Sequence, residues 1–208
     1  MTEPLQRIGK YEVKKKLGEG ATSEVYLCDD PFNSREVAVK VVFEDRLEQS
    51  DDGRLTRKLF ITEASLAGKL NHPHIVQIFE AVVGDDISYI VMEYVPGGTL
   101  EHFCNKDELL PIDKVVEIIF KCTRALDFAN RLGVTHRDIK PANILLTGET
   151  DIKISDFGAA LMASGEQTQV AGIGSPAYMS PQQHKGHQLD HRTDIYSLGV
   201  VLYKLLTG

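Results

Sequence analysis

A short polar segment in the second half of the chain constrains its fold more than any other feature. It reads His136-Arg137-Asp138-Ile139-Lys140-Pro141-Ala142-Asn143, and Asp156-Phe157-Gly158 follows closely. The two motifs supply a carboxylate that can act as a base, a lysine, an amide oxygen and a second carboxylate. Such a set can orient a hydroxyl, neutralise phosphate charge and hold a metal ion. We therefore interpret the segment as a catalytic loop, because chance does not readily produce this combination in this order.

The residues around this segment predict helix and strand. Ile144–Leu146 and Ile152–Ile154 are short strand candidates on either side of Gly148, so the polar groups adjoin strand ends. Upstream, apolar residues recur at intervals of three to four, which predicts a helix with one buried face and a C-terminal cap at Gly133. The residues of that face are Val115, Ile119, Cys122, Leu126 and Ala129.

The first part of the chain predicts antiparallel strands at residues 11–17, 25–28, 36–43 and 87–94. In the third strand, alternation places Ala38, Lys40 and Val42 on one face and Val37, Val39 and Val41 on the other. Lys40 is thus set among apolar groups. A lysine that extends its ammonium to water is the alternative interpretation.

An acidic residue interrupts the helix predicted next. Leu59, Leu66 and Leu70 form an apolar stripe of helical period, and Glu63 falls on the same face. A charge on a buried face needs a partner. Lys40 is the partner that we predict, and Asn71-His72-Pro73 ends the helix.

The loop Gly18-Glu19-Gly20-Ala21-Thr22-Ser23 joins the first two strands. Glycines let backbone N–H groups approach phosphate closely. Taken alone, the loop is equally a plain hairpin turn. A dinucleotide site is disfavoured, since a strand rather than a helix follows Ser23.

Taken together, these motifs resemble the eukaryotic-type (Hanks-type) serine/threonine protein kinases, since Lys140 follows Asp138 by two. The resemblance runs from about Tyr11 to the last residue and implies an α+β, bilobal fold. It implies a small β-rich N-lobe at about 11–94, a hinge at about 93–98 and a helical, partial C-lobe at about 99–208. The segment Tyr178-Met179-Ser180-Pro181 resembles the corresponding segment of bacterial kinases.

The resemblance also implies a role for each motif residue. Asp138 is the expected base and Lys140 steadies the transferred phosphate, while Asn143 and Asp156 hold Mg²⁺. His136 and Phe157 are expected to be packing elements. ATP is expected to meet Leu17, Gly18, Gly20, Ser23, Val25, Ala38, Lys40, Glu63, Met92, Glu93, Val95 and Leu145, with Met92 as gatekeeper.

Gly174-Ser175-Pro176 resembles the end of a kinase activation segment, in which the Ser175 hydroxyl would contact Asp138 and Lys140. The family usually has glutamate where Gln182 stands. Asp194 resembles the aspartate that ties down the catalytic loop. Arg137 in such kinases often meets a phosphorylated activation segment, and the candidate acceptors are Thr168 first, then Ser164 and Ser175.

The chain ends at Gly208, where family domains continue with further helices, so we expect a C-terminally truncated catalytic domain. Apolar residues of the last helix would then lack cover, and burial of each is worth about 1.5–3 kcal/mol. We expect weak stability or self-association through that helix. Its apolar residues are Ile195, Leu198, Val201, Leu202 and Leu205.

Composition limits the partners. The chain has 208 residues, 42% of them hydrophobic and 25% charged, and a formal charge of −7, which argues against nucleic acid as a partner. It shows no signal peptide or membrane segment, and its three cysteines match neither a disulfide framework nor a metal knuckle. His184, His187 and His191 are interpreted as solvated. We expect a cytoplasmic protein.

We therefore predict a serine/threonine protein kinase that transfers the γ-phosphate of ATP, with Mg²⁺, to protein substrates in signalling. One alternative is a truncated, non-catalytic pseudokinase that binds nucleotide or a partner. Gln182 and the early end favour it, whereas intact Lys40, Glu63 and Asp138 oppose it. A small-molecule kinase is the other alternative, and Lys140 and the Gly174-Ser175-Pro176 loop disfavour it.

Overall fold

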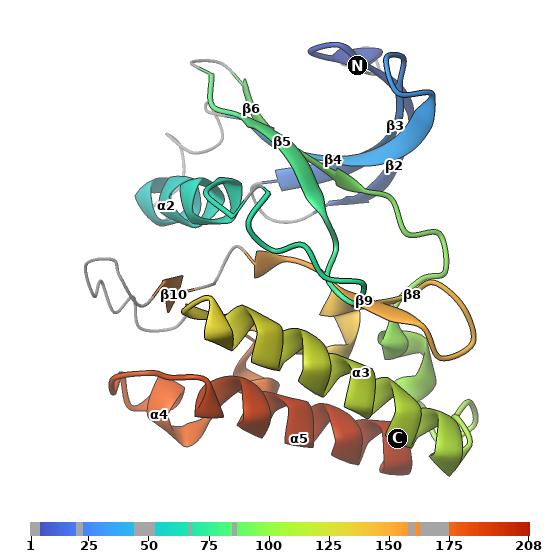
Figure 1. Cartoon of the computed structure of the whole chain (residues 1–208), viewed down its shortest axis with the longest axis vertical. Helices are drawn as coiled ribbons and strands as arrows, with labels where there is room; N and C mark the ends of the chain where they lie inside the picture. Colours follow the sequence, from blue (N-terminus) through green and yellow to red (C-terminus); the bar gives the residue numbers. More distant parts are fainter. Residues whose placement is uncertain are drawn as a thin grey trace. The chain divides into compact units, whose positions relative to one another are not determined.

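A computed structural model describes residues 5–19, 23–43, 53–66, 68–84, 87–157, 161–162 and 175–208. The chain divides into two compact units (Figure 1). The first comprises Met1–Leu70 and Gln77–Tyr94, and the second comprises Asn71–Val76 and Val95–Gly208.

The segment Asn71–Val76 belongs to the second unit, whereas the sequence placed it in the first. Backbone hydrogen bonds explain the difference. The Val76 N–H donates to the Ile154 carbonyl at 2.9 Å, and the Ile154 N–H donates to the His74 carbonyl at 2.9 Å. The His72 ring also stacks on Phe128, with ring centroids 5.0 Å apart.

The first unit is built on a curved antiparallel sheet (Figure 1), which has six strands among the described residues, in the order β1-β2-β3-β4-β6-β5. The strands are β1 (Arg7–Ile8), β2 (Tyr11–Glu19), β3 (Ser23–Asp30), β4 (Arg35–Phe43), β5 (Ile78–Val82) and β6 (Ile87–Glu93). The short strands β1 and β5 were not predicted, because runs this short carry little periodic signal.

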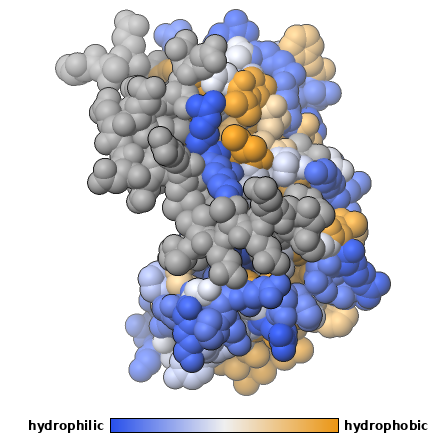
Figure 2. Space-filling model, turned by 90° about the vertical axis from the view of Figure 1, so that its left-hand side faces the viewer, coloured by the Kyte–Doolittle hydropathy of each residue, from blue (hydrophilic) through white to orange (hydrophobic). Residues whose placement is uncertain are grey.

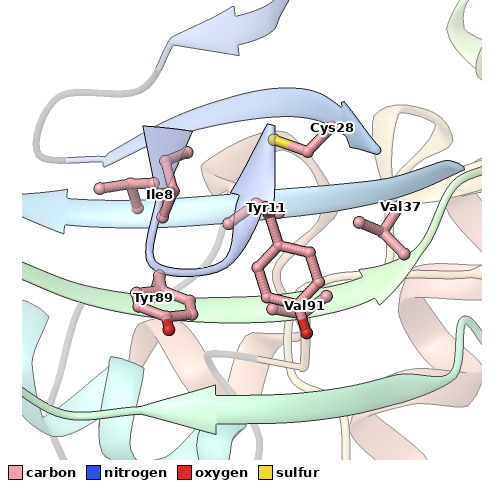
Figure 3. Close-up of a cluster of buried hydrophobic side chains, with 8 residues drawn as sticks. Ile8, Tyr11, Cys28, Val37, Tyr89 and Val91 are labelled. Atoms are coloured by element: carbon pink, nitrogen blue, oxygen red, sulfur yellow. The ribbon is translucent and has the colours of Figure 1, made fainter. Parts of the chain in front are cut away.

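One face of the sheet is covered by the β1–β2 hairpin. Figure 3 shows Ile8 and Tyr11 from this hairpin near Tyr89, Val91, Val37 and Cys28, all buried in one apolar cluster. The turn needs Gly9, whose φ is +54° and where a Cβ would lie 2.4 Å from the Tyr89 hydroxyl oxygen. Val39 and Val41 join the same cluster, which confirms the predicted alternation in β4.

The opposite face packs against helix α2 (Gly53–Ala64). Val42 from β4, Ile90 from β6 and Phe60 from α2 form a second buried cluster. The helix ends at Ala64 and not near Leu70 as predicted. Leu66 and Leu70 are nevertheless buried, so side chains of the apolar stripe remain buried beyond the end of the helix.

The second unit is built around two long helices, α3 (Ile112–Arg131) and α5 (Arg192–Thr207), which lie side by side (Figure 1). As predicted, α3 is followed by Gly133 with φ +73°, and the Gly133 N–H donates to the Asn130 carbonyl at 2.8 Å. Leu198, Val201 and Leu205 of α5 are buried within this chain, so the expectation that these residues lack cover is wrong. Ile195, by contrast, is exposed.

The buried face of α3 differs from the predicted one at a single position. Val115, Cys122, Leu126 and Ala129 are buried as predicted, whereas Ile119 is only partly buried and its neighbour Ile118 lies in the core. Adjacent isoleucines both satisfy a spacing of three to four, so the periodicity does not distinguish them.

Short elements complete the second unit. Strands β8 (Ile144–Leu146) and β9 (Ile152–Ile154) form a hairpin, and β7 (Val134–Thr135) pairs with β10 (Leu161–Met162). The remaining elements are the 3₁₀ helices η1 (Leu100–Cys104), η2 (Pro141–Asn143) and η4 (Pro176–Tyr178) and the short helix α4 (Pro181–His184). Most of the polar motif residues of this unit lie in the connections between these pieces.

The described surface of the face drawn in Figure 2 is mainly hydrophilic, with hydrophobic residues in smaller groups. Within the part of the chain that the structure describes, no helix combines the length and the apolar character needed to cross a membrane. Burial raises the pKa of the Cys28 thiol to about 11 and that of Cys122 to about 12, so both are neutral thiols.

Candidate active site

The first unit places Lys40 and Glu63 in an ion pair, as the sequence predicts. Lys40 Nζ lies 2.7 Å from Glu63 Oε2. The Glu63 side chain is only 2% exposed and that of Lys40 is 19% exposed, so the pair is shielded from water. Hydrogen bonds between ionised groups are roughly twice as strong as neutral ones. The pair therefore fixes the direction of the Lys40 side chain.

The strand residues on either side of the glycine loop are paired with each other. Gly18 pairs with Val25 across β2 and β3, and Glu19 pairs with Glu24. Lys16 bridges both sides, with Nζ 2.6 Å from Glu19 Oε2 and 3.0 Å from Glu24 Oε1. No Cβ contact constrains Gly18, which lies in open space. Gly20 lies outside the described residues, and Ser23 opens β3.

The other expected nucleotide residues of the first unit lie in register on neighbouring strands. Val25 pairs with Lys40 across β3 and β4, and Ala38 pairs with Met92 across β4 and β6. Glu93 ends β6 opposite Val37. Leu17 on β2 is exposed. Strand pairing thus brings Val25, Lys40, Ala38 and Met92 onto three adjacent strands.

In the second unit, Val95 is the first residue after the unit boundary, and Leu145 lies in β8. The chain between them approaches β8 closely, since the Leu146 N–H donates to the Gly98 carbonyl at 3.0 Å and Thr99 pairs with Leu145. Gly97 is required here, because a Cβ would lie 2.1 Å from the Leu146 carbonyl oxygen.

The catalytic loop has a strained backbone held by a buried aspartate. Arg137 has φ +72°, a conformation unusual for a residue with a side chain. Asp194 from α5 accepts the His136 N–H on Oδ2 and the Arg137 N–H on Oδ1, each at 2.8 Å. This confirms that Asp194 ties down the loop. Burial raises the pKa of the Asp194 carboxyl, while the two N–H donors oppose that shift.

Asp138 lies at the centre of a polar cluster. Its Oδ1 accepts the Ser175 N–H at 2.8 Å, and its Oδ2 lies 2.9 Å from Lys140 Nζ. Lys140 Nζ lies 2.9 Å from the Ser175 hydroxyl. The hydroxyl therefore contacts Lys140 as expected, whereas the contact with Asp138 is made by the backbone of Ser175.

His136 is a buried packing residue, as expected. Its Nδ1 accepts the Asp138 N–H at 3.2 Å, so Nε2 carries the proton and donates to the Ser155 carbonyl at 2.9 Å. Its ring packs against Phe157, with centroids 4.5 Å apart. Both ring nitrogens are engaged, which leaves neither for acid–base chemistry.

Asn143 and Asp156 present oxygen atoms suited to a hard cation. Asn143 Nδ2 donates to the Asp138 carbonyl at 2.8 Å, so its amide oxygen Oδ1 points elsewhere and can act as a ligand. The Ser155 N–H donates to the Asn143 carbonyl at 2.9 Å, which keeps the next residue, Asp156, close. Asp156 is held at φ +62°. Amide and carboxylate oxygens are the ligands that Mg²⁺ prefers, so this pair fits Mg²⁺.

The segment after Ser175 supplies residues that sequence reasoning missed. Ser180 and Gln183 form a capping box at the start of α4 and are both buried, whereas Gln182, the residue singled out from the sequence, is exposed. The Ser-x-x-Gln spacing signals such a box and could have revealed it. Thr168 and Ser164 lie outside the described residues. Within those residues, no group of three or more His, Cys, Asp or Glu is placed to hold a metal ion.

The chain belongs to the protein kinase family, since the family model described as protein kinase domain matches residues 11–208. It is 40% identical over 215 residues to the serine/threonine-protein kinase PknB of Mycobacterium leprae, covering 100% of this chain and 34% of PknB. It is 41% identical over 218 residues to a probable serine/threonine-protein kinase of Streptomyces coelicolor, covering 100% of this chain and 31% of that protein.

A third relative is a probable serine/threonine-protein kinase of Clostridium acetobutylicum, 39% identical over 202 residues that cover 96% of this chain and 30% of that protein. The chain thus spans about a third of the length of the curated relatives that it matches.

Proposed function

We propose that this chain is the catalytic part of a serine/threonine protein kinase, which transfers the γ-phosphoryl group of ATP to a protein hydroxyl. The observation that carries the proposal is the cluster of Asp138, Lys140 and Asn143, closed by Ser175. Phosphoryl transfer depends on positioning and on charge neutralisation, and this cluster offers both.

In this proposal Asp138 orients the acceptor hydroxyl and takes its proton on a carboxylate oxygen. The oxygen of the acceptor then bonds to the γ-phosphorus as the bond to the β,γ-bridging oxygen breaks, and ADP leaves. Lys140, already 2.9 Å from Asp138, neutralises charge on the transferred group. Asn143 and Asp156 would hold Mg²⁺, which would neutralise charge on the phosphates.

ATP contacts are proposed for two sets of residues. In the first unit, Lys40 binds phosphate oxygens while Glu63 holds its side chain in place, and Gly18, Gly20 and Ser23 offer backbone N–H groups. Leu17, Val25, Ala38 and Met92 supply apolar contacts to the base, and the backbone of Glu93 binds its polar edge. In the second unit, Val95 and Leu145 complete the set.

The non-catalytic alternative is not favoured. A pseudokinase typically lacks one of the groups that phosphoryl transfer needs, and here Lys40 is paired with Glu63 while Asp138 and Asn143 are hydrogen-bonded together. Serine or threonine is the proposed acceptor, because the relatives named above are serine/threonine-protein kinases and Lys140 contacts Ser175.

Incubation of the full chain with Mg²⁺ and radiolabelled ATP tests the proposal. The expected result is label on a generic protein acceptor, at serine or threonine after hydrolysis, and none on small alcohols. Label on small alcohols alone would indicate a small-molecule kinase. Nucleotide binding without any transfer would support the non-catalytic alternative.

We also propose that the chain is regulated by phosphorylation, at Thr168 first and at Ser164 or Ser175 after it. A phosphate adds about −1.5 to −2 charge and can order a segment beside an arginine such as Arg137. The Ser175 hydroxyl is already bonded to Lys140, which ranks it behind Thr168. Peptide mapping after incubation with Mg-ATP should find phosphate on Thr168. Its absence from residues 156–182 would exclude self-phosphorylation of this segment.

Self-association and a cytoplasmic location are further proposals. Ile195, Tyr196, Tyr203 and Leu206 of α5 are exposed, and such a face can pair with a second copy. Light scattering should show a dimer that Tyr203→Ser with Leu206→Ser converts to a monomer, whereas a wild-type monomer would contradict the proposal.

The proposed cytoplasmic location rests on the cysteines. The three cysteines are free thiols, which supports a reducing compartment.

A further inference from the structure

The side chain of Gln183 is buried against the catalytic loop, although no kinase motif discussed above assigns it a role. Gln183 is the third residue of α4 and is 6% exposed. Its Nε2 donates to the Arg137 carbonyl at 2.8 Å. Its Oε1 accepts the Ser180 N–H at 3.1 Å. The two ends of one amide therefore join the start of α4 to the catalytic loop.

The hydrogen-bond partners fix which end of the amide faces the loop. A backbone N–H only donates and a carbonyl only accepts, so Oε1 must face Ser180 and Nε2 must face Arg137. A carboxylate could serve Ser180 equally well. It could not donate to Arg137, and it would place an oxygen against the carbonyl oxygen instead.

The carbonyl that Gln183 holds belongs to the peptide that leads into Asp138. That peptide is planar, and its N–H is the Asp138 N–H, which donates to His136 Nδ1 at 3.2 Å. Arg137, on its other side, has φ +72° and donates its own N–H to Asp194 Oδ1. Because Gln183 donates to the carbonyl, both polar groups of the peptide are hydrogen-bonded. The peptide plane therefore cannot rotate without breaking one of these hydrogen bonds.

The segment that contains Gln183 also holds the Asp138 side chain, because the Ser175 N–H donates to Asp138 Oδ1 at 2.8 Å. Residues 175–184 thus hold Asp138 at its carboxylate and, through Gln183, at its backbone. We infer that Gln183 is a positioning residue, which sets the orientation of Asp138 from the segment that follows Ser175. This inference rests on the proposed function, in which Asp138 is the base.

Two near-isosteric substitutions separate the two ends of the amide. Gln183→Glu keeps the acceptor for Ser180 and loses the donor for Arg137, while Gln183→Met loses both. Gln182→Glu is the matched control, because it adds the same charge at the adjacent, exposed position of the same helix. Each variant is made in the full chain, and its unfolding temperature is measured beside its kinetics.

We expect Gln183→Glu to lower kcat on the order of 10- to 100-fold, the size of effect produced by a buried polar group left without its bond. The KM for ATP should stay within about twofold, because the effect is on orientation and not on nucleotide binding. Gln183→Met should lower kcat similarly, and Gln182→Glu should leave it unchanged. A folded Gln183→Glu with wild-type kcat would overturn the inference.

A pH series gives a readout that a purely structural role would not move. Protonation of the carboxylate introduced by Gln183→Glu restores a donor, so the ratio of that variant's kcat to the wild-type kcat should rise as the pH falls from about 8 to about 6. The charged or titratable groups bonded to this peptide or to its neighbour are Asp194 from α5 and His136 of the loop, while His184 on α4 is exposed and bonds to the Pro176 carbonyl. The Gln182→Glu variant contains the same groups, so the ratio of its kcat to the wild-type kcat should not change with pH. A flat ratio for Gln183→Glu would count against the inference.

Amide hydrogen exchange distinguishes failure of the inference from failure of the proposed function. Exchange at the Arg137 and Asp138 amides should quicken in Gln183→Glu and Gln183→Met and not in Gln182→Glu, whether or not the wild-type chain transfers phosphate. A wild-type chain without turnover but with this pattern contradicts the proposed function alone. Unchanged exchange, or unfolding of both Gln183 variants, overturns the positioning role.

Discussion

The two units of this chain place their site residues by different physical means. In the first unit, Lys40 is positioned by strand register and by its ion pair with Glu63, which lies 23 residues away in the sequence. In the second unit, the loop around Asp138 has little regular structure and is held by side chains from much later in the chain. Asp194 is 57 residues from Arg137, and Gln183 is 46 residues from it.

This difference between the units indicates which site residues contribute both to stability and to the proposed chemistry. The Lys40 and Glu63 pair is part of the buried structure of the first unit, so we expect its loss to affect both folding and the proposed nucleotide binding. An asparagine in place of Asp138 still offers an oxygen to the Ser175 N–H, and Asp194 and Gln183 hold the loop through its backbone. A substitution at Asp138 should therefore remove chemistry and leave the fold.

Asp138→Asn should have the largest effect on activity and almost none on stability. Loss of a general base typically lowers the rate about 10²- to 10⁴-fold, and a similar loss is expected for Asp156→Asn at the proposed metal site. Phosphate transfer and thermal unfolding measure the two effects. Near-full turnover in either variant would remove the residue from the proposed mechanism.

Lys40→Met should show the opposite balance, with stability and nucleotide binding falling together. Removal of one partner from a buried ion pair costs about 3–5 kcal/mol, and Glu63 is almost fully buried. Denaturant unfolding and nucleotide titration measure the result. Glu63→Gln is the matched control, since it keeps a hydrogen-bond acceptor for Lys40 and should lose less. Equal stability of Lys40→Met and wild type would end the contrast between the units.

Asp194→Asn should weaken the second unit by about 1–3 kcal/mol, the cost of leaving a buried N–H without an acceptor. The carboxylate accepts two N–H groups, one on each oxygen, and an amide offers only one oxygen. Turnover should fall with stability here, unlike in Asp138→Asn. If stability is lost without any change in turnover of the folded fraction, Asp194 does not position the loop.

Glu80→Gln should have the smallest effect, and only above acidic pH. The Lys10 ammonium, and then the Tyr11 hydroxyl, hold the pKa of Glu80 below its ordinary value of 4.5. A lowered folded-state pKa means that the stabilisation is present above pH 4.5 and is lost as the pH falls through the folded value. Glu80 is about a third exposed, so screening limits the effect to less than about 1 kcal/mol.

Unfolding temperatures of Glu80→Gln and wild type should therefore differ at pH 7 and converge in acid. Tyr11→Phe is the control, because it removes a hydrogen bond to Glu80 without removing a charge. Burial, then the bond to Glu80, raises the pKa of Tyr11 to about 12, so its hydroxyl stays neutral in this range. Loss of that neutral donor to Glu80, 2.6 Å away, should also lower stability. A pH-independent difference for Glu80→Gln would show that the carboxylate charge is not the cause.

The sequence alone determined the longer strands of the first unit, most of the buried face of α3 and the pairing of Lys40 with Glu63. Those features follow from periods of two and of three to four residues, and from the need of a buried charge for a partner. It also singled out Asp138, Lys140, Asn143 and Asp156, by their order and spacing, as candidate site residues. These patterns depend on residue types and short spacings, so they can be recognised in the sequence without the folded structure.

Only the tertiary structure decided which glutamine matters, where α2 ends and to which unit Asn71–Val76 belongs. Gln182 and Gln183 are adjacent and chemically identical, and burial of one against Arg137 depends on how α4 packs. The apolar stripe continues past Ala64 because Leu66 and Leu70 are buried outside the helix, which periodicity does not distinguish from burial within it. For Gln183 and for Asn71–Val76, the deciding contacts are hydrogen bonds to segments far away in the sequence, and the spacing of residues does not reveal such contacts.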